Sequence, residues 1–263
     1  MPAVLTRRAT MVSGIGITRA ARLLLFVVSL CAACGWWQPH PSRADSLAAR
    51  AANQPTYDGL HKPDPADRAN AVRALQKAGD VEAVPQLLEL LSDPDARVGL
   101  YVAQALGDLA TASALEELRA ALRDPDPDMR FRAALALGER GDVLSTYALT
   151  RALRDPDVLV QRTAAEALAR IGTPEAVDSL VAALNSTQDS IIRNAMSALQ
   201  TIGEPAVQKL ATALQSPNPF VRKNAATTLS YIGSPVASGV LQAATEDSDR
   251  KVVAEVTWAV SQI

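Results

Sequence analysis

The sequence predicts an all-α protein, a right-handed solenoid of about six and a half helix pairs, from two observations. The first is a repeat of about 31 residues, marked by Asp-Pro-Asp at residues 93–95, 124–126 and 155–157. Stacked supersecondary units are typical of such a period. The second is that aromatic residues make up only 4% of the chain, while alanine and leucine are abundant. That composition favours close helix packing over a β-sandwich. A leucine recurs with the same spacing, at Leu60, Leu91, Leu122, Leu153, Leu184 and Leu214.

Residues 1–33 are predicted to be a signal peptide. Residues 1–22 contain four arginines and no acidic residue, and the uncharged run LLLFVVSLCAAC follows at residues 23–34. This run is too short for a membrane-spanning helix, which needs about 20 residues. It fits the apolar core of a secretory signal.

The end of this segment resembles the lipobox of bacterial lipoproteins, through Ala32, Ala33 and Cys34 with Leu30 upstream; Cys31 departs from the aliphatic residue of that motif. The resemblance implies lipidation of Cys34, which would hold the protein on a membrane. Residues 34–59 would then be a lipid-anchored flexible tether. An ordinary cleaved secretory signal and an uncleaved anchor are the alternatives.

The lipoprotein interpretation predicts a bacterial cell-envelope protein on the periplasmic side. Trp36, where some inner-membrane lipoproteins have aspartate, favours the outer membrane. Cys31 and Cys34 are the two cysteines of the chain, so the repeats contain no cysteine for a disulfide, a zinc site or a thiol nucleophile.

Each repeat shows start and stop signals for helices. The last residue of the Asp-Pro-Asp motif, or its variant, is placed to cap the first helix of the unit, and a glycine near the end of that helix suits the left-handed conformation. A second helix follows after a short turn. The expected caps are Asp64, Asp95, Asp126, Asp157 and Asn218, and the glycines are Gly79, Gly141, Gly172, Gly203 and Gly233.

The pattern Asp-Pro-(Asp/Asn)-x-x-Val-Arg-x-x-Ala-Ala-x-Ala-Leu-x-x-x-Gly, best seen at residues 155–172 and 216–233, resembles the short HEAT repeat of the phycobilisome lyase type. The resemblance covers residues 60–263 and implies an armadillo-like helical stack. Six full units would start near Lys62, Asp93, Asp124, Asp155, Ser186 and Ser216, with a half-unit from Thr245.

The resemblance also implies that an arginine four positions after the cap pairs with aspartates of its own or the next unit. The arginine is present as Arg68, Arg130 and Arg222, whereas Gly99, Gln161 and Ile192 interrupt the series. We interpret this series as structural, because partly exposed ion pairs contribute only about 0–1 kcal/mol each.

Small residues line one side of the first helices, at Ala71, Ala133, Ala164, Ala195, Ala225 and Ala254. They predict a close approach of neighbouring helices. Near the C-terminus we expect Trp258 to pack inwards, in register with Leu106, Leu137, Leu168, Leu199 and Leu229. The alternative is an apolar end covered by a partner, a second copy or the membrane.

The residue types and motifs of the sequence do not indicate catalysis. We expect no catalytic residue, no metal and no cofactor. A related di-iron hydroxylase uses several His-Glu pairs, but His40 and His61 are the two histidines here and neither precedes a glutamate. The alternative function is a lyase or isomerase for a phycobilin-type chromophore on another protein. A mildly acidic chain also argues against sequence-independent nucleic-acid binding.

The interpretation we favour is a non-enzymatic scaffold or adaptor, exported and membrane-tethered, that holds a protein or extended peptide on its concave face. Self-association at the C-terminal end is a further possibility. The second helices should line the concave face, and acidic residues give way to basic ones towards the C-terminus. The candidate partner-binding residues are Gln86, Glu89, Glu117, Arg151, Ser179, Lys209, Thr212 and Gln242.

Overall fold

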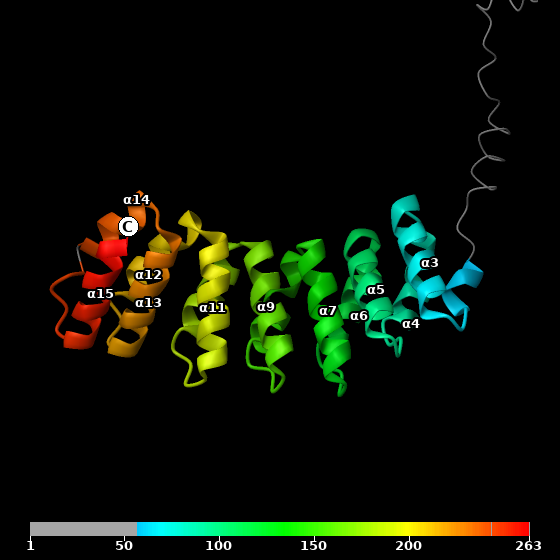
Figure 1. The fold of residues 1–263 in the computed structure, drawn as a ribbon, viewed down its shortest axis with the longest axis horizontal. Helices are drawn as coiled ribbons and strands as arrows, with labels where there is room; N and C mark the ends of the chain where they lie inside the picture. The colour runs from blue at the N-terminus through cyan, green and yellow to red at the C-terminus, as the bar shows by residue number, and fades with distance from the viewer. Residues whose placement is uncertain (1–56, 243, 263) are drawn as a thin grey trace, which may run out of the picture. The chain divides into compact units, whose positions relative to one another are not determined.

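The computed structural model describes residues 57–242 and 244–262 (Figure 1). Within them the chain forms α-helices and short 3-10 helices, with no strand. The predicted signal peptide, the lipidation site Cys34 and residues 34–56 of the tether lie outside the described residues. Residues 57–59, which we assigned to the tether, belong to a 3-10 helix that packs on the first repeat.

Six helix pairs and one further helix make up the repeats, which confirms the predicted solenoid of six and a half units. The first helices of the units are α3 (Pro65–Ala78), α5 (Ala96–Leu109), α7 (Pro127–Arg140), α9 (Val158–Ile171), α11 (Asp189–Ile202), α13 (Pro219–Ile232) and α15 (Arg250–Gln262). The second helices are α4 (Val84–Leu90), α6 (Ala112–Ala121), α8 (Thr146–Ala152), α10 (Pro174–Ala183), α12 (Val207–Ala213) and α14 (Pro235–Gln242). The 3-10 helices are η1 (Tyr57–His61), η2 (Val81–Ala83), η3 (Val143–Ser145) and η4 (Glu204–Ala206).

The two kinds of helix form two layers with the core between them. Figure 1 shows the first helices side by side from α3 to α15, and each packs on the next one. From α5 onwards, each first helix also packs on the second helix of the preceding unit. One leucine from each helix except α15 is fully buried between the layers. These are Leu75, Leu106, Leu137, Leu168, Leu199 and Leu229 from first helices, and Leu87, Leu118, Leu149, Leu180, Leu210 and Leu241 from second helices.

The predicted caps and glycines are confirmed. Asp157 accepts hydrogen bonds from the amides of Leu159 and Val160 at 2.8 and 3.1 Å, and the other four predicted caps also accept from the first turn. The five predicted glycines all have positive φ. The start of α11 differs, because Gln188 occupies the capping position without a capping hydrogen bond.

The arginine series bridges consecutive units, as expected. Arg130 binds both carboxylate oxygens of Asp155 at 2.8 Å and donates to the carbonyl oxygen of Asp124 at 2.9 Å. Arg68 and Arg222 bind Asp93 and Asp247 of the following unit in the same way. Each arginine therefore joins a first helix to the loop that starts the next first helix.

The interruption at Gly99 is filled from the next unit. At Gly99, the buried Arg132 of α7 occupies the space beside the glycine and donates to the carbonyl oxygens of Leu91 and Asp93 at 2.6 and 3.1 Å. Asn224 stands at the equivalent position of α13 and donates to the Leu184 carbonyl at 3.0 Å. These contacts satisfy helix-end carbonyls that would otherwise be buried without a partner.

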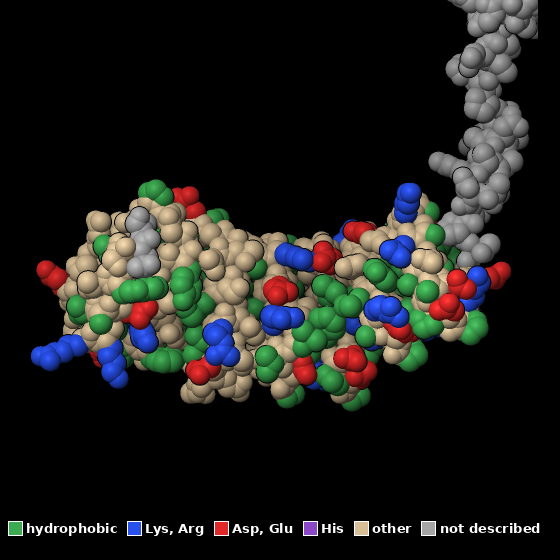
Figure 2. Space-filling view, viewed as in Figure 1, with side chains coloured by type: hydrophobic (Ala, Val, Ile, Leu, Met, Phe, Trp, Pro, Cys, Tyr) green, Lys and Arg blue, Asp and Glu red, His purple; other side chains and the backbone are tan. Residues whose placement is uncertain are grey.

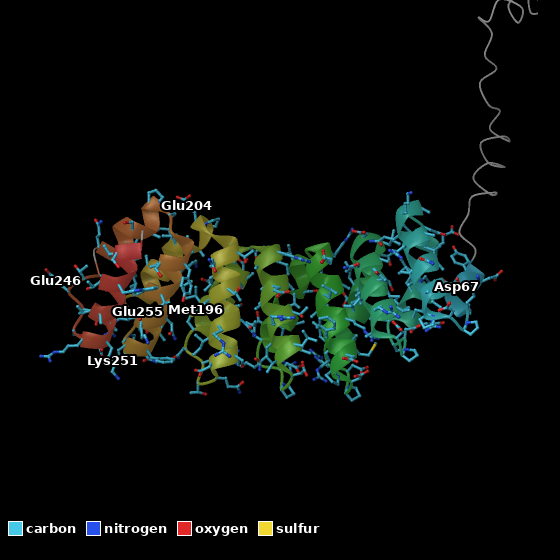
Figure 3. The ribbon with its side chains drawn as sticks, in the orientation of Figure 1. Asp67, Met196, Glu204, Glu246, Lys251 and Glu255 are labelled. Carbon is cyan, nitrogen blue, oxygen red and sulfur yellow. The ribbon has the colours of Figure 1, made fainter. Side chains whose placement is uncertain are left out.

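The expectation for Trp258 is wrong. Its side chain is 43% exposed, and the partly buried Val260 takes the register of the leucines. The cause is the start of α15, where Asp249 accepts from the amide of Lys251 and so sets the register of the helix. The same shift places Ala254 on the surface and Val256 in the core. Glu255 of α15, which Figure 3 labels, accepts a hydrogen bond from Thr227 of α13.

No helix in residues 57–242 and 244–262 is long and apolar enough to cross a membrane. Figure 2 shows a face of the repeats on which acidic and basic side chains are interspersed, without a continuous patch of one sign.

Candidate protein-binding surface

The candidate binding residues all lie on second helices and all reach solvent. Five are exposed: Glu89, Glu117, Arg151, Thr212 and Gln242. Gln86, Ser179 and Lys209 are half-buried. We call the surface formed by the outward residues of the second helices the second-helix face.

Two of the half-buried candidates, Ser179 and Lys209, make contacts between neighbouring second helices. Ser179 of α10 accepts a hydrogen bond from Thr150 of α8 at 2.9 Å. Lys209 of α12 pairs with Asp178 of α10 at 2.7 Å. This ion pair neutralises the positive charge expected at the C-terminal end of the face.

Helix geometry explains the difference between Arg151 and the two half-buried candidates Ser179 and Lys209. A residue one position from the buried leucine is turned from it by only about 100°, whereas a residue two positions away is turned by about 160°. Arg151 follows Leu149 by two positions and is exposed. Ser179 and Lys209 directly precede Leu180 and Leu210 and lie at the flank of their helices.

Gln242 is one position out of register. In α12 the exposed Thr212 follows the buried Leu210 by two positions, whereas in α14 Gln242 directly follows the buried Leu241. The equivalent of Thr212 is residue 243, whose placement the structure does not describe. Gln242 is exposed, yet it does not continue the row formed by Glu89, Arg151 and Thr212.

The outward side of α8 carries a patch that the sequence reasoning missed. Leu144 of η3 and Tyr147 of α8 are 77% and 73% exposed. Tyr147 and Arg151 lie on the side of α8 opposite the buried Leu149. We call these three residues the α8 patch. Counting two positions back from each buried leucine would have found Tyr147.

The other units present different chemistry at the same positions. The equivalents of Tyr147 are Pro85, Glu116, Asp178 and Gln208, all exposed. An exposed tyrosine beside an arginine therefore marks one unit near the middle of the stack. Tyrosine and arginine are enriched among the residues that dominate protein-protein binding energies.

A network holds α8 against α6. Arg119 of α6 pairs with Glu116 at 2.7 Å and also with Asp142, which begins η3. Asp142 in turn accepts a hydrogen bond from the fully buried Ser145. The α8 patch is therefore carried by a segment fixed to the preceding unit.

No site for a metal is formed by the described residues. They contain no group of three or more His, Cys, Asp or Glu side chains that could hold a metal ion, and His61 is exposed at the end of η1.

The fold defines an α-solenoid protein, and the family model for HEAT repeats matches residues 53–126, 115–200 and 194–261. The chain therefore belongs to the HEAT-repeat family. No curated protein matches it in sequence.

Solved structures with a similar fold include human deoxyhypusine hydroxylase in complex with glycerol, at 22% identity over 82% of this chain and 97% of that one, with a TM-score of 0.39. The complex of CpcE and CpcF of phycocyanin lyase from Nostoc sp. PCC7120 matches at 21% identity over 78% and 91%, with a TM-score of 0.43. Designed armadillo repeat proteins for modular peptide recognition match at 17% identity over 68% and 99%, with a TM-score of 0.34. At these identities the likeness concerns the fold alone.

Proposed function

We propose that this protein is a non-enzymatic scaffold that binds another protein, or an extended peptide, on its second-helix face. The main support for this proposal is the exposure of the α8 patch. Burying two large exposed apolar side chains next to an arginine is a favourable way to build the centre of an interface. A solenoid with polar surroundings offers such a patch to a partner that lies across several units.

The scaffold is exported and held at the envelope membrane in this proposal. Support comes from the basic residues, the apolar run and the lipobox-like ending at Cys34.

The lipid anchor is tested by expressing the chain with its native N-terminus, as wild type and as Cys34→Ala, and by fractionating the cells. Wild type in the membrane fraction and Cys34→Ala in the soluble fraction are expected. An unchanged distribution would contradict the lipid anchor.

The scaffold function is tested by crosslinking whole cells and identifying what co-purifies. A specific partner should be recovered with wild type and with Tyr231→Ala, and lost with Tyr147→Ala. Tyr231 is the matched control, because it is an exposed tyrosine on a first helix. Equal recovery with Tyr147→Ala, or no protein partner at all, would contradict the proposal.

The alternative function, a chromophore lyase or isomerase, predicts that the purified chain binds a tetrapyrrole with a spectral shift. The scaffold proposal predicts no shift.

Self-association through the C-terminal unit is supported by the exposed Trp258 on α15. Sedimentation at increasing concentrations should then show a dimer that Trp258→Ala abolishes. A monomer at all concentrations would contradict it.

A further inference from the structure

An open groove between the C-terminal ends of α6 and α8 is lined by charged side chains. Its charged residues are Arg123, Asp124, Arg130, Arg151, Arg154 and Asp155. The groove adjoins the α8 patch, because Arg151 belongs to both.

Three of the four arginines make no side-chain contact that stabilises the fold. Arg130 is held in its bidentate pair with Asp155. Arg123, Arg151 and Arg154 are exposed, and among the described residues their side chains have no ion pair or hydrogen bond. Their guanidinium groups are free to bind a ligand.

The groove is positively charged after its internal pairs are counted. Asp124 is the one lining carboxylate outside the Arg130–Asp155 pair, and it accepts a hydrogen bond from the amide of Asp126 at 2.8 Å. No arginine of the preceding unit pairs with Asp124, because Gly99 stands at the position that Arg68 and Arg130 occupy in their units. Three free arginines therefore face one free carboxylate.

The other second helices lack this concentration of charge. The equivalents of Arg151 are Glu89, Ala120, Ala182 and Thr212. The equivalents of Arg154 include Ser92, Asn185 and Gln215, and also Arg123, which belongs to the same groove. The basic groove is thus a local property of the unit that also carries the exposed Tyr147 and Leu144.

We propose that the α6–α8 groove binds an acidic, extended segment of a partner protein, with its carboxylates on Arg151, Arg154 and Arg123. The inference rests on the proposed function and specifies the partner. A guanidinium group presents paired donors in a plane, which matches a carboxylate better than a lysine ammonium does. The network of Arg119, Asp142 and Ser145 orders α8 before binding, which lowers the entropic cost of association.

The helix geometry sets the spacing of the bound residues. Tyr147 and Arg151 are four residues apart, so their Cβ atoms are about 5–6 Å apart on one side of the helix. An extended chain advances about 3.3 Å per residue. An apolar residue against Tyr147 therefore lies two positions from an acidic residue at Arg151, with a second acidic residue two positions further on for Arg154.

A fluorescein-labelled synthetic peptide with the core Leu-Ser-Glu-Ser-Glu is the probe, and a peptide with both glutamates replaced by glutamine is its control. Binding to the purified full-length chain is measured by anisotropy at low and high salt. The acidic peptide should bind about tenfold more tightly than the glutamine peptide, because hydrogen bonds to charged groups are the stronger ones. High salt should remove most of that difference.

The double variant Arg151→Glu/Arg154→Glu should weaken binding of the acidic peptide by at least about tenfold. Arg193→Glu is the matched control, because Arg193 is exposed on the first helix α11, and it should change binding less than about twofold. Thermal melting by circular dichroism verifies that each variant is folded. Equal binding of the two peptides, or an equal effect of Arg193→Glu, would overturn the inference.

The failure of this inference is distinguishable from the failure of the proposed function. If a cellular partner depends on Tyr147 while neither peptide binds, the acidic-segment inference is overturned and the scaffold function stands. If the acidic peptide binds through Arg151 and Arg154, the inference is supported.

Discussion

Asp247 shows how single residues couple the units to pH. Hydrogen bonds from Arg222, opposed by burial and aided by the amide of Asp249, hold the pKa of Asp247 below its ordinary value. A carboxylate whose pKa is lowered by folding stabilises the protein at pH values above its unfolded pKa of about 3.9. That stabilisation is lost as the pH falls through the folded pKa.

We therefore predict that acidification weakens the contact between α13 and α15, and that Arg222→Gln reduces this acid sensitivity. Urea unfolding at neutral pH and at about pH 3 measures the effect. Arg193→Gln is the control, because it removes the same charge from an exposed site of α11. An unchanged pH dependence in Arg222→Gln would contradict the role of the pair.

Gly99 illustrates a packing constraint at the residue scale. A Cβ atom at this position would overlap the guanidinium group of Arg132, which is buried and held by the carbonyl oxygens of Leu91 and Asp93. We predict that Gly99→Ala lowers the free energy of unfolding by about 1–3 kcal/mol. Gly239→Ala is the control, since nothing lies within 4 Å of a Cβ there, and it should be neutral or stabilising. Denaturant unfolding of both variants decides between these outcomes.

At the scale of helices, α11 is the one first helix with a described cap residue that makes no capping hydrogen bond. We predict that Gln188→Asp stabilises the protein by about 1 kcal/mol, because an aspartate accepts from the first-turn amides. Asp157→Ala should destabilise it by about 0.5–2 kcal/mol for the converse reason. Urea unfolding compares the two, and a neutral or destabilising Gln188→Asp would contradict this account of helix initiation.

Much of the helical architecture could be predicted, because caps and glycines act locally. Asp157 and Gly172 mark the two ends of α9 through their own conformational preferences, whatever surrounds them. The register at the C-terminal end could not be read from leucine spacing, because Asp249 restarts the helix there and moves Trp258 out of the core.

Which candidate residues are exposed could be predicted in part, for a geometric reason. Counting rows along the repeat found Arg151 but also selected Ser179 and Lys209, which lie at the flank of their helices and contact the neighbouring unit. This comparison of positions missed Tyr147. Its exposure becomes evident only when the rotation of about 100° per residue around the helix is taken into account. The position of Arg132 beside Gly99 depends on the stacking of two units and has no local signal.

At the scale of the whole molecule, each unit is stabilised by its two neighbours, so a local defect should spread only to adjacent units. Ala164 is fully buried on α9, which packs against α7 and α11. We predict that Ala164→Leu destabilises the protein by about 1–3 kcal/mol. Hydrogen exchange should increase most in α7, α9 and α11. Ala120→Leu, at an exposed position of α6, is the control, and uniformly increased exchange along the stack would contradict the nearest-neighbour account.

The most direct test of the central claim is site-specific photo-crosslinking in cells. A photoreactive amino acid replaces Tyr147 in one version of the chain and Tyr231 in another, so that an exposed tyrosine position on each face is compared. The account predicts a discrete crosslinked partner from position 147 and none from position 231. Crosslinking from position 231 alone, or from neither position, would contradict the claim that the second-helix face around α8 binds the partner.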